Sequence, residues 1–106
     1  MTQKVSDILN DLKRLLAGVY GPRLVTLVLF GSQARGDAEI ESDIDVLVVL
    51  RGTVSWEEEL NRTNGMLTEL GLDYDAVISC VFVSEEEYGR DQSPLFLNVR
   101  REGIAV

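Results

Sequence analysis

The chain has 106 residues, with ten Lys and Arg against eighteen Asp and Glu, which gives a net charge of −8 and no histidine. The length predicts a single domain spanning residues 1–106, with one hydrophobic core. Without histidine, a Ser-His-Asp triad and a His-ligated zinc site are excluded. Because Cys80 is the single cysteine, an internal disulfide is excluded as well.

The charge and hydropathy patterns further limit the expected ligands and the expected location of the protein. The acidity argues against tight binding to a nucleic-acid backbone, and it concentrates in residues 31–60, which hold eight acidic and two basic side chains. No apolar run reaches the ~18 residues that a membrane span needs, and the N-terminal stretch is amphipathic, unlike a signal peptide. With its single thiol, the chain is expected to be cytoplasmic.

Hydrophobic periodicity predicts the elements of the first half. Apolar residues recur at helical spacing over residues 5–19, which predicts an amphipathic helix ending before Gly21 and Pro22. Leu24–Phe30 is almost wholly apolar and too short for a typical helix, so a buried strand is expected. Residues 31–42 are polar, with a short helix starting at Ser32. Ile44–Leu50 is a second buried strand.

The second half alternates in the same way. Residues 55–58 fit a capping box and open a helix, for which Gly71 is the expected stop. Four apolar residues are expected along one side of that helix: Trp56, Leu60, Leu67 and Leu70. Residues 74–83 read as a third strand, residues 84–87 cap a short helix, and residues 93–103 form a last helix. Strands alternating with helices predict an α/β fold.

Two aspartates mark the start of the second strand. Asp43 and Asp45 are two residues apart, so an extended backbone places both side chains on one face. Carboxylates held about 7 Å apart repel each other unless solvent or a cation neutralises them. Because the strand continues into the core, full solvation is not expected. A divalent cation such as Mg²⁺ suits oxygen ligands of this kind.

A glycine and a serine lie where the first strand turns toward the short helix. Gly31 allows close approach of the backbone to a ligand, and a helix start offers N–H groups to an anion. The Ser32 hydroxyl adds a donor. Together with Asp43 and Asp45, this turn describes a site for a nucleoside triphosphate between phosphate-binding and metal-binding groups. Such a site supports in-line displacement at phosphorus.

A third carboxylate would complete the site. Asp73 and Asp75 are two residues apart where the third strand is expected to begin. We favour Asp75, because it repeats the carboxylate-then-apolar pattern of the second strand. It would bind a second metal ion and accept the proton of the attacking hydroxyl.

Residues 31–37 (GSQARGD) followed by residues 42–46 (SDIDV) resemble the signature of the DNA polymerase β nucleotidyltransferase superfamily. More narrowly, they resemble its minimal nucleotidyltransferases, with their GSxARG and SDxD pattern. The resemblance implies a mixed sheet with helices packed against it, and contacts from Gly31 and Ser32 to the β- and γ-phosphates. It also implies that Asp43 and Asp45 bind Mg²⁺, with Mn²⁺ as an alternative. The third acidic position of the family has no motif.

The resemblance also implies a partner. Larger members carry a helical domain that holds the acceptor, whereas minimal members commonly work beside a separate all-helical protein of the HEPN class. In some such toxin–antitoxin pairs, the nucleotidyltransferase adds AMP to a tyrosine of the partner and silences its ribonuclease activity. The expected activity is therefore two-metal transfer of a nucleoside monophosphate, AMP from ATP, to a hydroxyl on such a partner.

Several alternatives stay open at this point. The chain could be a non-catalytic module that neutralises a partner by contact, or a transferase acting on a small molecule. Arg35 could contact a phosphate or the partner, or form a surface ion pair with Asp37 or Glu39. Trp56 is expected to pack or cap its helix rather than stack on a base. The acceptor, the preferred nucleotide and the oligomeric state are not given by the sequence.

Overall fold

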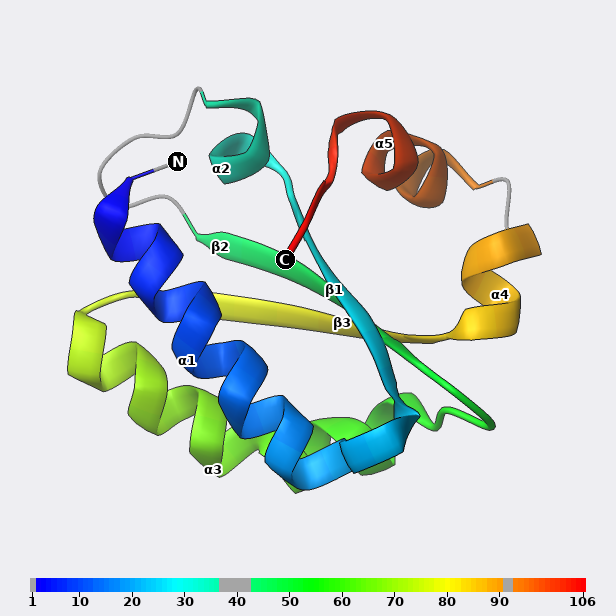
Figure 1. Cartoon of the computed structure of the whole chain (residues 1–106), viewed down its shortest axis with the longest axis horizontal. Helices are drawn as coiled ribbons and strands as arrows, with labels where there is room; N and C mark the ends of the chain where they lie inside the picture. The colour runs from blue at the N-terminus through cyan, green and yellow to red at the C-terminus, as the bar shows by residue number, and fades with distance from the viewer. Residues whose placement is uncertain (1, 37–42, 91–92) are drawn as a thin grey trace.

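A four-stranded mixed sheet organises the chain, with strand order β3-β2-β1-β4 (Figure 1). The structure, a computed structural model, describes residues 2–36, 43–90 and 93–106. Strand β1 is antiparallel to β2 and β4, and β2 is parallel to β3. The strands are β1 (Leu24–Phe30), β2 (Ile44–Leu50), β3 (Ile78–Ser84) and β4 (Ile104–Ala105). The helices are α1 (Gln3–Tyr20), the 3₁₀ turn η1 (Gly21–Arg23), α2 (Ser32–Arg35), α3 (Trp56–Tyr74), α4 (Glu85–Arg90) and α5 (Pro94–Glu102).

Helices cover both faces of the sheet, which explains why its central strand is apolar on both sides. Helices α1 and α3 lie together at one face, and α4 and α5 lie at the other (Figure 1). Alternate residues of β2 serve the two layers: Val46 and Val48 face α1 and α3, while Leu47 and Val49 face α5. A strand buried on both faces reads as a continuous apolar run, as predicted. The mixed α/β sheet is confirmed.

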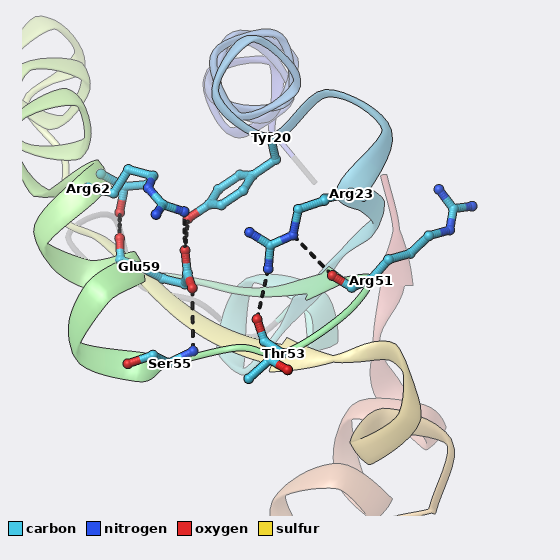
Figure 2. A network of polar contacts seen from close by, with 8 residues as sticks. Tyr20, Arg23, Arg51, Thr53, Ser55, Glu59 and Arg62 are labelled. Atoms are coloured by element: carbon cyan, nitrogen blue, oxygen red, sulfur yellow. Dashed lines mark hydrogen bonds and ion pairs between the residues drawn. The ribbon is translucent and has the colours of Figure 1, made fainter.

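A buried polar network joins α1 to α3 (Figure 2). Glu59 is 2% exposed, and its carboxylate accepts hydrogen bonds from the Tyr20 hydroxyl at 3.1 Å and the Arg62 guanidinium at 2.7 Å. It also accepts the backbone N–H of Ser55 at 3.4 Å. The capping contact that the sequence assigned to Glu58 is therefore made by its neighbour Glu59. Burial and the Glu59 hydrogen bond raise the pKa of Tyr20 to about 12.

Helix α3 is longer than the sequence predicted, and this moves the start of the third strand. The helix continues past Gly71 to Tyr74, and Asp75 forms its C-cap in the left-handed conformation, with φ 51°. Gly71 lies against the carbonyl oxygen of Ala76, which a Cβ would approach to 2.6 Å. This glycine therefore permits close packing rather than stopping the helix. The predicted strand over residues 74–83 was wrong at its start, because β3 begins at Ile78.

The predicted cap of α4 is confirmed, whereas the predicted apolar side of α3 is only partly buried. The backbone N–H of Glu87 donates to the Ser84 hydroxyl at 3.1 Å, which confirms the cap of α4. Leu67 is buried as expected, but Trp56 and Leu60 are 50% and 37% exposed, so the expected apolar side of α3 faces solvent at its first turns. In the part of the chain that the structure describes, no helix combines the length and apolarity needed to cross a membrane.

Candidate active site

Asp43 and Asp45 lie together at the start of β2, as the sequence predicted. Asp43 directly precedes the strand and is exposed, while Asp45 is its second residue and is partly buried. The pKa of Asp45 is raised, first by burial and then by the negative charge of Asp43, with Arg35 acting in the opposite direction. The two carboxylates are therefore close enough to repel each other. A divalent cation at this pair would remove that penalty.

Gly31 brings the turn after β1 against the carboxylate of Asp45. Phe30 and Asp45 are paired across the antiparallel ladder, which places the next residue, Gly31, beside that side chain. A Cβ on Gly31 would lie 2.5 Å from the Oδ2 atom of Asp45. Gly31 also has φ 76° and ψ −157°, a backbone conformation that essentially only glycine adopts. Both observations require a glycine at this position.

The structure therefore brings the predicted phosphate-binding turn to the predicted cation-binding pair. Ser32 begins α2 immediately after Gly31, and the Gly31 carbonyl accepts the N–H groups of Ala34 and Arg35 at 3.1 Å each. The short helix thus begins beside Asp45. Backbone and hydroxyl donors at a helix start favour an anion, and carboxylates favour a cation. A triphosphate with its bound cation matches both.

Arg35 forms the far end of the same turn. Its guanidinium pairs with Glu102 at 3.4 Å, with the two side chains 44% and 34% exposed, and so links α2 to the end of α5. Its positive charge also offsets part of the rise in the pKa of Asp45. The proposed ion-pair partners Asp37 and Glu39 lie outside the described residues. An ion pair this exposed contributes at most about 1 kcal/mol, and it leaves the cation close to the site.

The strand position beside Asp45 holds a serine. In the parallel ladder Asp45 is paired with Ser79, so the two side chains share one face of the sheet. Asp75 is exposed at the end of α3, ahead of β3. Within residues 2–36, 43–90 and 93–106, no three acidic, histidine or cysteine side chains gather as a metal-binding group. Asp75 as the third ligand stays a prediction.

Sequence reasoning missed Ser79 because that position follows from the register between two strands. With the correct start of β3, the place of Ser79 on the sheet could have been predicted, because side chains alternate along an extended backbone. Because β3 begins at Ile78, Asp75 lies in the C-cap of α3 and not on the strand.

Residues 5–95 match the family model of the nucleotidyltransferase domain. The chain belongs to the nucleotidyltransferase domain family. It is also 36% identical over 100 residues to MJ0604 of Methanocaldococcus jannaschii, a proposed protein adenylyltransferase, covering 93% of this chain and 90% of that protein.

Solved structures share the fold of this nucleotidyltransferase. One, described as a proposed minimal nucleotidyltransferase, is 25% identical with a TM-score of 0.60, and the match covers 100% of this chain and 97% of that one. Another holds the tri-AMPylated HEPN toxin of Shewanella oneidensis in complex with its MNT antitoxin. That match has 20% identity and a TM-score of 0.61, and covers 95% of this chain and 70% of that one. The resemblance to minimal nucleotidyltransferases and the fold it implied are confirmed.

Proposed function

We propose that this nucleotidyltransferase transfers AMP from ATP to a hydroxyl group of a partner protein. The observation that carries the proposal is the contact between the Gly31 backbone and the Asp45 carboxylate, because it joins a triphosphate turn to a cation-binding pair. The choice of adenylate and of a protein acceptor is supported by the relative from M. jannaschii, which is described as a proposed protein adenylyltransferase.

The side chains suit a divalent metal ion, with Mg²⁺ as the first choice and Mn²⁺ as an alternative. Asp43 and Asp45 are oxygen ligands, and burial together with the negative charge of Asp43 raises the pKa of Asp45. They would hold the ion, which when bound neutralises the triphosphate and stabilises the charge that develops at phosphorus. Under the two-ion hypothesis Asp75 supplies a third carboxylate for a second ion.

The remaining groups of the site position the reaction. The Gly31–Ser32 turn holds the β- and γ-phosphates through backbone N–H groups and the Ser32 hydroxyl. The acceptor oxygen attacks the α-phosphorus, and the bond from that phosphorus to the bridging α–β oxygen breaks. Pyrophosphate leaves with the bonding electron pair. The proton of the acceptor hydroxyl passes to a carboxylate of the site, for which we predict Asp75.

A helical protein of the HEPN class is the proposed acceptor, with this chain as the antitoxin of a toxin–antitoxin pair. Support comes from the fold shared with the MNT antitoxin of S. oneidensis, whose HEPN toxin carries AMP in the complex. Transfer to a protein also suits the acidic surface of the chain, whose net charge is −8, because such a surface attracts a basic partner.

The proposal is tested by the mass of the partner. A HEPN-type protein from the same genome is incubated with the chain, ATP and MgCl₂, and its intact mass is measured. We expect added AMP with the unaltered chain and none with Asp45→Asn, while Glu69→Gln, a change at an exposed carboxylate of α3 outside the site, serves as the matched control. Full transfer by Asp45→Asn would show that the mechanism is wrong.

The same experiment separates the alternatives. Complex formation that Asp45→Asn leaves unchanged, with no AMP on the partner from either protein, would favour neutralisation by contact alone. Loss of transfer in Asp75→Asn, with Asp73→Asn unaffected, would support the third-carboxylate prediction. Turnover by the isolated chain on a small hydroxyl compound would instead favour a small-molecule acceptor.

A further inference from the structure

Exposed apolar side chains gather along one groove between α3 and β3. The groove has a volume of about 1080 Å³. Its lining includes Trp56, Leu60 and Leu72 of α3 and Val77 just before β3, which are 50%, 37%, 78% and 59% exposed. Large apolar side chains that cluster on a surface in this way mark an interaction site more often than a scatter of single residues does.

The same groove runs along an open strand edge. Among the described residues β3 pairs with β2 alone, at the end of the sheet order. The N–H of Ile44 donates to the Val77 carbonyl at 2.9 Å, so odd-numbered residues of β3 direct their backbone groups toward β2. The backbone groups of Ile78, Cys80 and Phe82 therefore point to the open edge, where an added strand can pair with them.

The groove leads to the candidate active site. Ser79 and Gln33 both line it. Ser79 is the strand partner of Asp45, and Gln33 follows Ser32 in the short helix α2. A segment lying along β3, which spans roughly 23 Å at about 3.3 Å per residue, would thus have one end beside Ser79, one strand away from Asp45.

Charges at the two ends of the edge decide between possible occupants. Glu85, Glu86 and Glu87 follow β3 directly, while Asp73 and Asp75 precede it, and all five are exposed. Two copies of the chain paired through β3 about a two-fold axis would run antiparallel and bring these acidic ends together. Like charges placed in that way disfavour a second copy. A segment with basic residues at both ends is complementary to the edge.

We propose that the open edge of β3 and its apolar groove bind an extended, basic-ended segment of the acceptor protein as an added strand, which delivers the acceptor hydroxyl to Asp45. This inference rests on the proposed function, because it names how the acceptor reaches the same site. Main-chain hydrogen bonds to the edge supply general affinity, and the pocket beside Trp56 and Leu60 selects apolar side chains at alternate positions.

A synthetic peptide tests the inference directly. The probe carries lysines at both ends and one tyrosine within an alternating valine–threonine core, and a matched peptide replaces alternate core residues by proline. Without ATP or metal, we expect the probe to slow amide hydrogen exchange at Ile78, Cys80 and Phe82, and the proline peptide to have no such effect. Leu60→Arg should weaken probe binding by roughly tenfold or more. Leu95→Arg, at a comparably exposed leucine of α5, should leave it unchanged.

Three results would overturn the inference. They are no protection of these amides by the probe, equal protection by ATP alone, and protection that appears without peptide as the protein concentration rises. ATP protection would assign the groove to the nucleotide, and concentration dependence would assign it to a second copy. Because binding is measured without ATP, its failure is separate from that of the proposed function. The proposed function is judged separately, by whether a HEPN-type partner gains AMP in ATP and MgCl₂.

Discussion

Replacing Gly31 by alanine tests the central contact of the site. The new Cβ would lie 2.5 Å from the Asp45 Oδ2 atom, closer than such atoms pack, so the carboxylate would have to move. The backbone at φ 76° and ψ −157° adds strain of about 1–3 kcal/mol for a residue with a Cβ. Gly36 is a matched control: its φ is 79° and ψ 10°, and a Cβ there would meet nothing within 4 Å. Gly36→Ala should cost about 1–2 kcal/mol through strain alone.

Two measurements separate strain from displacement of the carboxylate. Urea unfolding of the two variants and the unaltered chain gives the free energy of unfolding, and AMP transfer is measured per folded molecule. We expect both variants to lose stability, with the larger loss in Gly31→Ala. Transfer should fall by roughly tenfold or more in Gly31→Ala, because a shift of about 1 Å in a catalytic group costs that much or more. Gly36→Ala should keep nearly full transfer.

One result for Gly31→Ala would refute the need for a glycine beside Asp45. If Gly31→Ala loses no more stability than Gly36→Ala and transfers AMP at the same rate as the unaltered chain, the approach of the backbone to Asp45 is not required. The turn would then have to bind the triphosphate independently of the carboxylate pair.

Three further predictions follow from the buried and titrating groups. The folded-state pKa of Asp45 is raised, so its ionised form destabilises the fold above that pKa; without metal ions, Asp45→Asn should be the more stable protein at neutral pH. Urea unfolding should show this advantage fading as the pH falls through the raised pKa toward the ordinary aspartate value, and a difference independent of pH would contradict the assignment. Glu59→Ala should lower the free energy of unfolding by about 2 kcal/mol. This loss is small for a buried charge because the side chain of its partner Arg62 is 45% exposed. Glu58→Ala, at the exposed neighbour, should change the free energy of unfolding by about 0.5 kcal/mol or less. Equal losses by thermal or urea unfolding would show that the network in Figure 2 does not stabilise the helix pair. Burial raises the pKa of Cys80 to about 12, so a thiol reagent at neutral pH should modify it only after unfolding, and rapid labelling of the folded chain would disprove its burial.

The sequence predicted the elements well where a local pattern decides them. The apolar runs Leu24–Phe30 and Ile44–Leu50 are strands with the expected bounds, because a strand buried on both faces has few polar residues. The end of α3 was misplaced because Gly71 usually signals a stop, whereas here it allows contact with Ala76. The short strand β4 was missed because a two-residue strand has no periodicity to detect.

The candidate site was predictable as far as its residues are close in sequence. Asp43 and Asp45 share a strand start, and Gly31 with Ser32 forms a turn, so local spacing describes each pair. Their juxtaposition depends on the antiparallel register, and the place of Ser79 depends on the parallel one. Registers of this kind follow from packing of the whole sheet, which spacing along the chain does not determine.

The most direct test of nucleotide transfer is to measure which phosphate of labelled ATP reaches the partner protein. A HEPN-type partner is incubated with the chain and MgCl₂ in the presence of ATP labelled at either the α- or the γ-phosphate. If the Gly31–Ser32 turn and the carboxylates of Asp43 and Asp45 transfer AMP, the partner gains the α-label alone, and Asp45→Asn abolishes the gain. Appearance of the γ-label on the partner, or of the α-label with undiminished rate in Asp45→Asn, would contradict the account.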